Sequence, residues 1–527
     1  MASALLVASC TPEPDAAPRP NVLLVSIDTL RADHLSSYGY DRETSPNLDA
    51  LARRGARFER TFSTTSWTLP SHMSMLTGLP ISAHGVCDDR LWSLTDDAGN
   101  PSPVEQLGVF IPEVLKDEGY RTGGFYTWQY VDKRYGFGPG FETFERWGHT
   151  FYSDEVVSAE WNRLREADDK PGLEALQARH PDLFDPTHMS SPETIGRALD
   201  WIDEVKADTP DAPFFAFVHL FDVHDPYTPP APFDTMFDPD YTGTIDGKNI
   251  TAANSPFVRD MPKADFDHVV ALYDGGISYV DAQLGKLFAE LEARGELENT
   301  IVMVTSDHGE EFFEHGNKTH RKSLFAESVH VPWIVAWPGM IDPGAEIDGA
   351  TGIIDIAPTI YGLLGLGAPD GTIGRDLAPV LRGEASNEDS IYLQELLLFE
   401  AGKETQQRLG LLRGAQHTVL GGELGADLQV VHFDLESDPD EKTVLNVSLL
   451  NEPGADQTRD QLDAMRKAIS SSREQSRSRN VGSDSLPTAN SQAELAAMGY
   501  TDGNQPTESS SNSDHDHKLC LDGCRWL

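Results

Sequence analysis

Cysteine is scarce in this chain: Cys10, Cys87, Cys520 and Cys524 are the only four among 527 residues. So few cysteines exclude a dense disulfide framework, and the fold must therefore be held together by a buried core. A chain of this length can bury a substantial core, and we expect it to divide into one large and one small unit.

Positive charge is scarce as well. The 41 Lys and Arg residues face 85 Asp and Glu residues, which gives a formal net charge of −44. Because so large an excess of negative charge repels the phosphates of nucleic acids, we do not expect DNA or RNA as a partner. The acidic surface favours solubility and carries no information about the reaction.

Long apolar runs are also lacking, because no stretch beyond the first ten residues approaches the ~20 apolar residues of a transmembrane helix. The first ten residues, MASALLVASC, join a short apolar run to Cys10, as a bacterial lipoprotein signal does. No Lys or Arg precedes the run, so an accidental resemblance is the alternative. We expect residues 1–19 to be a signal and tether. The protein would then be exported, either periplasmic or tethered to a membrane through a lipid on Cys10.

Three short apolar segments, residues 21–27, 214–220 and 300–305, predict strands buried on both faces of a parallel sheet. Acidic residues or histidines follow each of them, namely Asp28, then Asp222 and His224, then Asp307 and His308. In open α/β sheets ligands bind at the carboxyl ends of the strands, so we expect these side chains to converge.

Segments with helical periodicity at 45–54 and 277–291 separate these strands. The alternation predicts an α/β fold, with a large, mostly parallel central sheet flanked by helices, over residues 20–385. Short strand-like segments at 391–393, 409–412 and 430–435 then predict a smaller α+β C-terminal subdomain over residues 386–503. The polar residues 504–527 are expected to be disordered.

A hydroxyl residue, Thr68, precedes a proline-led helix start in the segment SWTLPSHMSMLTG, residues 66–78. The free N–H groups and the positive dipole of a helix N-terminus suit an anionic ester. Asp28, Asp307 and His308 offer hard oxygen and imidazole ligands, and Thr68 can add its oxygen to the same cation.

These four residues predict one divalent ion, Mn²⁺, Ca²⁺ or Mg²⁺, which would lower the pKa of the threonine hydroxyl. Each residue also has an ordinary structural interpretation. Asp28 and Thr68 could cap helices, and residues 307–309 could form a turn. It is their joint occurrence that favours a metal site.

The order of these segments resembles the sulfatase family of the alkaline-phosphatase superfamily over most of residues 20–440. The matching blocks include 21–40 (NVLLVSIDTLRADHLSSYGY), 67–78, 220–230 (LFDVHDPYTPP), 299–316 and 433–439 (FDLESDP). The resemblance implies an alkaline-phosphatase-like fold, with Asp28, Asp307 and His308 as metal ligands and Thr68 as the nucleophile. It also implies that His224 contacts the substrate or protonates the leaving group.

The chain departs from the family pattern at the reacting residue. Sulfatases carry Cys or Ser in a Cys-x-Pro-Ser-Arg motif, which is converted to formylglycine, and Thr68 cannot undergo this conversion. His72 stands where the motif has Arg, Trp128 lies in the segment that matches Lys-Trp-His, and Arg321 lies near a second sulfate-binding lysine of the family. We expect four residues to contact the substrate: His72, Trp128, His320 and Arg321.

Most of the positively charged residues that bind sulfate in the family are altered in this chain. This departure from the family favours an ester of phosphorus over one of sulfur. We expect a metal-dependent hydrolase that cleaves a small anionic ester, a phosphodiester or phosphonate ester or a sulfate, through Thr68. One alternative is a sulfatase that works without formylglycine. Others are a phosphoglycerol-type transferase of the cell envelope and a non-catalytic binding protein with the same fold.

Overall fold

The computed structural model describes residues 19–86, 108–147, 156–157, 160, 163–164, 170–180, 190–248, 250–251, 255–388, 390–400, 403–423 and 428–480. The predicted signal with Cys10, the other three cysteines and the tail at 504–527 lie outside these residues.

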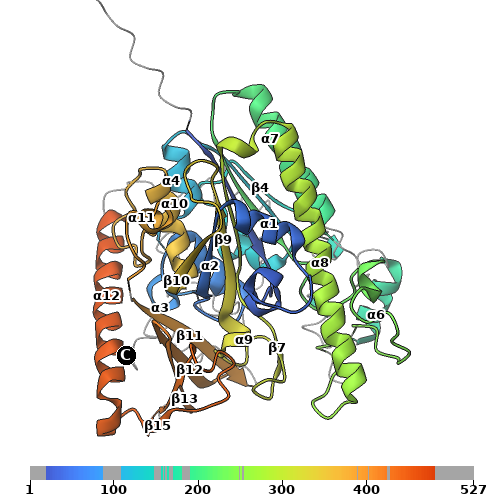
Figure 1. Ribbon diagram of the computed structural model, residues 1–527, viewed down its shortest axis with the longest axis vertical. Helices are drawn as coiled ribbons and strands as arrows, with labels where there is room; N and C mark the ends of the chain where they lie inside the picture. The colour runs from blue at the N-terminus through green and yellow to red at the C-terminus, as the bar shows by residue number, and fades with distance from the viewer. Residues whose placement is uncertain are drawn as a thin grey trace, which may run out of the picture.

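An eight-stranded sheet with the order β10-β2-β9-β6-β1-β5-β3-β4 forms the centre of the molecule (Figure 1). Its strands are β1 (Asn21–Ile27), β2 (Ala56–Phe62), β3 (Arg121–Tyr126), β4 (Thr143–Arg146), β5 (Phe214–Leu220), β6 (Thr300–Ser306), β9 (His330–Ala336) and β10 (Ala345–Gly352). β1 runs parallel to both of its neighbours, β5 and β6, whereas β9 is antiparallel to β6 and β2. The predicted large, mostly parallel sheet is confirmed.

Helices cover both faces of this sheet, and as a result every residue of β1 is buried. Val22 and Leu24 pack into one apolar cluster with helix α2 (Thr68–Thr77), while Leu23 and Val25 pack into the other with helix α8 (Lys263–Ala293). Successive side chains of a strand point to opposite faces, so an uninterrupted apolar run is what a sheet covered on both sides requires.

The remaining helices of the main sheet are distributed between these two clusters. α4 (Ile111–Asp117), α10 (Ile356–Leu363) and α11 (Ala378–Leu381) contribute to the cluster of α2, and α1 (Pro46–Arg54) and α7 (Ser191–Asp208) to that of α8. Shorter elements are α3 (Ile81–His84), α9 (Ala326–Val329), β7 (Glu311–Phe312) and β8 (Lys318–Thr319), and α6 is Lys170–Arg179. The helix expected at 277–291 is the C-terminal half of the longer α8.

A second sheet follows, with five antiparallel strands in sequence order. They are β11 (Ile391–Glu400), β12 (Lys403–Arg413), β13 (Gln416–Glu423), β14 (Gln429–Asp434) and β15 (Asn446–Leu449). Helix α12 (Asp456–Asn480) packs on this sheet through Leu462, Met465 and Ile469. The three predicted strand segments overlap β11, β12 and β14, whereas the sequence did not predict β13 or α12.

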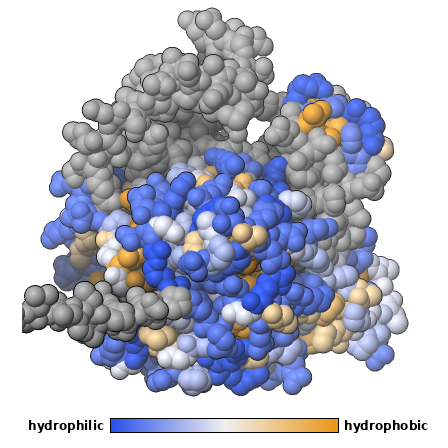
Figure 2. Space-filling view, turned by 90° about the horizontal axis from the view of Figure 1, so that it is seen from above, coloured by the Kyte–Doolittle hydropathy of each residue, from blue (hydrophilic) through white to orange (hydrophobic). Residues whose placement is uncertain are grey.

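On the face shown in Figure 2, hydrophilic residues dominate the coloured area and apolar residues form only small patches. None of the helices in the described part of the chain combines the length and apolar character that a membrane span requires.

Candidate metal and catalytic centre

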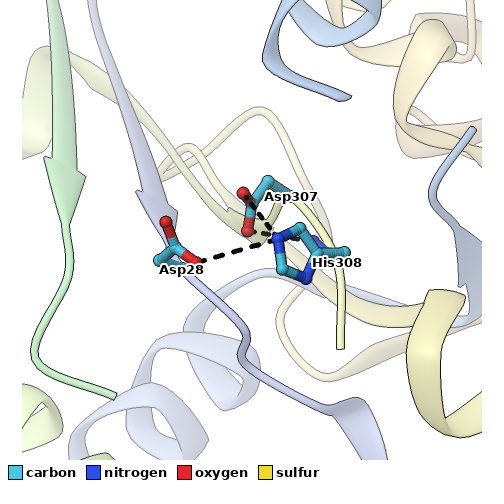
Figure 3. A group of neighbouring side chains, drawn as sticks. All are labelled: Asp28, Asp307 and His308. Atoms are coloured by element: carbon cyan, nitrogen blue, oxygen red, sulfur yellow. Dashed lines mark hydrogen bonds and ion pairs between the residues drawn. The ribbon is translucent and has the colours of Figure 1, made fainter. Parts of the chain in front are cut away.

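Two neighbouring strands deliver the acidic side chains of the site. Asp28 is the first residue after β1 and Asp307 the first after β6, and the parallel register pairs Ile27 with Ser306 immediately before them. His308 follows Asp307, and the three side chains point toward one another (Figure 3). One ligand atom from each lies within 4.8 Å of the other two, and all three residues are buried. The structure therefore brings together Asp28, Asp307 and His308 as the sequence predicted.

The unpaired atoms of this cluster fit a cation. Among the described residues, Asp28 Oδ1 and Asp307 Oδ2 have no hydrogen-bond partner although both are buried. His308 donates its Nδ1–H to the carbonyl of Gly309 at 2.9 Å, which leaves the lone pair of Nε2 facing the carboxylates at 3.8 Å (Asp28) and 3.4 Å (Asp307). Buried carboxylate oxygens without partners are costly, and a shared divalent ion satisfies them together with the imidazole.

Burial determines the protonation of the cluster. It raises the pKa of the Asp28 carboxyl, and it raises that of Asp307 to about 7, with the neighbouring charge of Asp28 adding to the effect. Burial lowers the pKa of His308 to about 3, so its imidazole is neutral at physiological pH. A neutral imidazole is the form that binds metal ions.

Thr68 is the first residue of α2, so the helix begins two positions before Pro70, where the sequence predicts its start. Its side chain is 2% exposed. Oγ1 lies 3.4 Å from Asp28 Oδ2, to which the hydroxyl donates, and 3.4 Å from His308 Nε2. Thr68 therefore contacts the cluster from a third segment of the chain. It lies at the N-terminus of α2, which is the positive end of the helix dipole.

His72 and His219 pack against the carboxylates from the interior. His72 donates its Nδ1–H to the carbonyl of Thr68 at 2.9 Å, accepts from Ser26 Oγ at Nε2, also at 2.9 Å, and lies 3.5 Å from Asp307 Oδ2. His219, on β5, lies 3.2 Å from Asp28 Oδ2 through Nε2. Burial lowers the pKa of both histidines to about 4.

His72 was expected to contact the substrate, and the structure places it fully inside the protein, one helical turn beyond Thr68. Sequence reasoning missed His219. The available signal was a histidine within an otherwise apolar strand, at the second-to-last position of β5.

A second group of polar side chains lies beside His308. The ring of His320 is 4.7 Å from that of His308 and 4.9 Å from that of His224. Glu310, which sequence reasoning also missed, accepts from His320 Nδ1 at 3.0 Å and from the Tyr227 hydroxyl at 2.9 Å. Burial raises the pKa of Glu310 to about 7 and holds that of His320 well below its usual range.

His224 is held in one orientation. Its Nδ1–H donates to the carbonyl of Asp225 at 2.7 Å, and its ring stacks on Phe221 at 4.4 Å. Burial lowers the pKa of His224, but the carboxylates of Asp225, Asp28 and Glu310 more than offset this and raise it to about 9. The imidazole is therefore charged at neutral pH, and Nε2 carries a proton that it can donate.

The other two expected contact residues flank the site. Trp128 stacks on Phe221 at 4.5 Å, so that Phe221 lies between Trp128 and His224. Arg321 places its guanidinium 3.8 Å above the ring of Trp67, the residue before Thr68, and its backbone N–H donates to Ser66. The structure thus brings Trp128 next to His224, and Arg321 next to the segment that carries Thr68.

Comparison with known proteins gives two family matches. Residues 20–366 match the family model described as Sulfatase, and residues 314–470 match the one described as N-sulphoglucosamine sulphohydrolase, C-terminal. An ulvan-active sulfatase from Formosa agariphila is 25% identical over 457 residues, which cover 85% of this chain and 81% of that protein.

A multifunctional alkaline phosphatase superfamily protein, PehA, from Trinickia caryophylli is 26% identical over 419 residues, covering 69% of this chain and 77% of that protein. Among solved structures, the phosphonate monoester hydrolase of Agrobacterium radiobacter matches with a TM-score of 0.60 at 22% identity, over 87% of this chain and 96% of that one. This likeness confirms the expected alkaline-phosphatase-like fold.

Proposed function

The chain belongs to the sulfatase family and is a hydrolase of ester bonds, and from this membership we propose that it cleaves a small anionic ester with Thr68 as the nucleophile. The ester is a phosphodiester or a phosphonate monoester, with a sulfate ester as the second candidate. One observation carries the proposal: Thr68 Oγ1 lies 3.4 Å from both Asp28 Oδ2 and His308 Nε2, beside the unpaired carboxylate oxygens.

Four residues, Asp28, Thr68, Asp307 and His308, would hold one Mn²⁺, Ca²⁺ or Mg²⁺. When bound, such an ion lowers the pKa of a hydroxyl and neutralises charge that develops on ester oxygens. The chain's own contribution is to orient Thr68, whose hydroxyl donates to Asp28, and to present the positive end of the α2 dipole to an anionic group.

The reaction then proceeds in two displacements at phosphorus. Thr68 Oγ forms a bond to phosphorus, its proton leaves towards Asp28, and the bond to the leaving oxygen breaks. His224 gives the proton on Nε2 to that oxygen, which departs as an alcohol. Water next attacks phosphorus and gives one of its protons to His224, the bond to Thr68 Oγ breaks, and Thr68 Oγ recovers the proton that Asp28 received.

Two features support phosphorus ahead of sulfur. A threonine cannot be converted to formylglycine, and an unmodified alcohol is a sufficient nucleophile for a two-step displacement on phosphate. In addition, PehA is described as multifunctional, and the Agrobacterium radiobacter enzyme is a phosphonate monoester hydrolase. The sulfate candidate is supported by both family matches and by the ulvan-active sulfatase.

A substrate panel tests the proposal. Hydrolysis of 4-nitrophenyl esters (a phosphodiester, a phosphonate monoester, a phosphate monoester and a sulfate) would be followed with added Mn²⁺, Ca²⁺ or Mg²⁺ and after chelation. We expect the phosphodiester or the phosphonate ester to react fastest, with metal dependence, and a phosphorylated Thr68 to appear by mass spectrometry after rapid quenching. Turnover of sulfate alone would favour the second candidate, and no turnover of any ester would refute the proposal.

Transfer to an alcohol is distinguished from hydrolysis by the products. With glycerol added, a transferase forms a new glycerol ester, whereas the proposed hydrolase releases the free acid. We expect the free acid as the main product.

We propose in addition that the protein is exported and tethered through a lipid on Cys10. The short apolar run before Cys10 and the proline-containing segment after it support this proposal. Labelling with a radioactive fatty acid in a bacterial host should mark the wild-type protein and not the Cys10→Ser variant, and an unlabelled wild-type protein would contradict the tether.

A further inference from the structure

An acidic side chain of the C-terminal part of the chain is turned into the protein near the site. Glu441 follows β14 and is 2% exposed, although the side chains of its neighbours Asp440 and Lys442 are 59% and 64% exposed. Its backbone has a φ of 53°, a left-handed conformation that a non-glycine residue rarely adopts. Such strain persists only where surrounding contacts enforce it.

Glu441 makes three contacts, with one buried and two partly buried partners. Its Oε2 accepts the backbone N–H of Ala326 at 2.6 Å, its Oε1 lies 2.5 Å from Nδ1 of His417, and its carbonyl lies 3.2 Å from Nε2 of His315. Two of these partners, Ala326 and His315, belong to the segment that follows the metal cluster, and the third belongs to β13. In Figure 1 the segment with α9 lies beside the strands of the C-terminal sheet.

The first path from Glu441 leads through α9 to the loop of His308. Because His315 faces two oxygen acceptors, Glu441 O and Glu327 Oε1 (2.8 Å), it donates from both nitrogens and bridges them. The backbone of α9 then accepts from the two residues after His308: Gly309 N–H donates to Ser328 and Glu310 N–H to Glu327, each at 2.9 Å. The packing there is tight, since a Cβ on Gly309 would lie 2.1 Å from the Glu327 carbonyl.

The second path leads through the C-terminal sheet to α2. Nε2 of His417 lies 2.8 Å from Oε1 of Gln394, whose Nε2 donates to the carbonyl of Ser63 at 3.1 Å. Ser63 Oγ is 2.7 Å from Oγ of Ser71, which lies on α2 three positions after Thr68 and donates to the carbonyl of Asp307.

We propose that Glu441 is a positioning residue, which fixes both the metal-ligand loop at residues 307–310 and the first turn of α2 from the C-terminal sheet. The two paths reach the loop at different points, one at Gly309 and Glu310 and the other at the Asp307 carbonyl. Hydrogen-bonded partners behind metal ligands set the orientation of those ligands, and losing one typically costs about 10–100-fold in metal affinity or activity. The inference rests on the proposed function only in taking Asp28, Asp307 and His308 as a metal site.

The test compares Glu441→Gln and Glu441→Ala with Glu436→Gln, which changes an exposed acidic residue five positions earlier. Three quantities are measured on the full chain: Mn²⁺ affinity by calorimetry, kcat and KM for the preferred ester, and hydrogen exchange of the backbone amides. We expect roughly a tenfold or greater loss of Mn²⁺ affinity and of kcat in the Glu441 variants, with little change in KM, and wild-type values for Glu436→Gln. Faster exchange should be confined to residues 307–310, 326–329 and the first turn of α2.

Each outcome is decisive for one of the two proposals. If the wild-type protein binds no Mn²⁺ and cleaves no ester, the proposed function fails, and hydrogen exchange still decides the positioning role. If Glu441→Ala keeps wild-type exchange at Gly309 and Glu310, and wild-type affinity and kcat, the inference is wrong. Should Glu441→Ala fail to fold, His315→Gln and Gln394→Met cut the two paths one at a time, and unchanged exchange and kcat in both would overturn it.

Discussion

Thr68 Oγ1 and His308 Nε2 lie 3.4 Å apart, although 240 residues separate them in the chain. The contact joins the start of a helix to the end of a central strand, and it places an alcohol against an imidazole whose lone pair is free to bind a cation. The contact therefore places a threonine beside the carboxylates and imidazole, at the position where the Cys-x-Pro-Ser-Arg motif of sulfatases has Cys or Ser.

Thr68→Ala should lower kcat by at least about 10³-fold, because it removes the nucleophile and leaves only binding and electrostatic effects. Thr68→Ser should retain measurable turnover, since it keeps an oxygen at the same position. Both variants should melt within a few degrees of the wild-type protein in a thermal scan. Near-normal turnover by Thr68→Ala would exclude the threonine as nucleophile.

Replacing His224 by Gln should affect esters according to their leaving group. We expect a loss of about 10²–10⁴-fold with an alkyl leaving group, which needs a proton, and a much smaller loss with 4-nitrophenolate. Because the pKa of His224 is raised to about 9, the donating form is present below that pH. The rate for alkyl esters should therefore fall as the pH rises through about 9 in the wild-type protein, and the same fall in His224→Gln would rule out the assignment.

Metal binding should stabilise the folded protein. An ion that binds only the folded state contributes about 2.7 kcal/mol at a free concentration 100 times its Kd. We therefore expect Mn²⁺ to raise Tm in a scan of chelated protein, and Asp307→Asn to abolish most of that rise because it removes one of the converging carboxylates. An equal rise in the variant would place the metal elsewhere.

Gly309→Ala should disturb the ligand loop, because the added Cβ would lie 2.1 Å from the carbonyl of Glu327. We expect a destabilisation of about 1–3 kcal/mol together with weaker metal binding. The matched control is Gly196→Ala on α7, where a Cβ meets no described atom within 4 Å. The control should be neutral or slightly stabilising, since alanine favours a helix interior by up to about 1 kcal/mol over glycine. Equal effects of the two changes on metal affinity would contradict this account.

The pairing of His315 with Glu327 should make stability depend on pH. Burial lowers the pKa of His315, but the hydrogen bond and the charge of Glu327 raise it to about 9 from its usual 6.5. A folded pKa above the unfolded one contributes stability that is complete below pH 6.5 and is lost as the pH rises through 9. The Tm difference between the wild-type protein and His315→Gln should therefore be largest near pH 6 and shrink above pH 9, whereas a constant difference would show that the pair contributes no pH dependence.

The sequence was sufficient for the elements that have a strong local pattern. β1, β5 and β6 are short, mostly apolar runs with acidic residues or histidines close behind them, so both their burial on two faces and the position of Asp28 and Asp307 could be predicted. Helix α12 could not, because Leu462, Met465 and Ile469 are its main apolar contacts in a strongly polar segment. Tertiary packing on the second sheet, rather than local propensity, accounts for this helix.

Residues of the site could be predicted from the sequence only where a family motif falls at the end of a predicted strand. His219 lies inside β5, where a histidine in an otherwise apolar strand marks an unusual position but does not show that it contacts Asp28. Glu441 is 134 positions beyond Asp307, in a polar turn whose composition looks like that of any exposed turn. Its inward orientation depends on partners from two distant segments of the chain, and no local pattern specifies such a contact.

The central place of β1 in the sheet also has a consequence for how the protein is made. Its two neighbours, β5 and β6, are synthesised late: the partner of Asn21 in β6, Thr300, follows 279 residues later. At typical rates of 5–20 residues per second, this apolar strand waits roughly 15 to 55 s on the ribosome before both of its edges can be paired. Pairing over such distances in sequence is slow and leaves unpaired strands open to aggregation. The strand that leads to Asp28 is therefore one part of the nascent chain that a chaperone would have to protect.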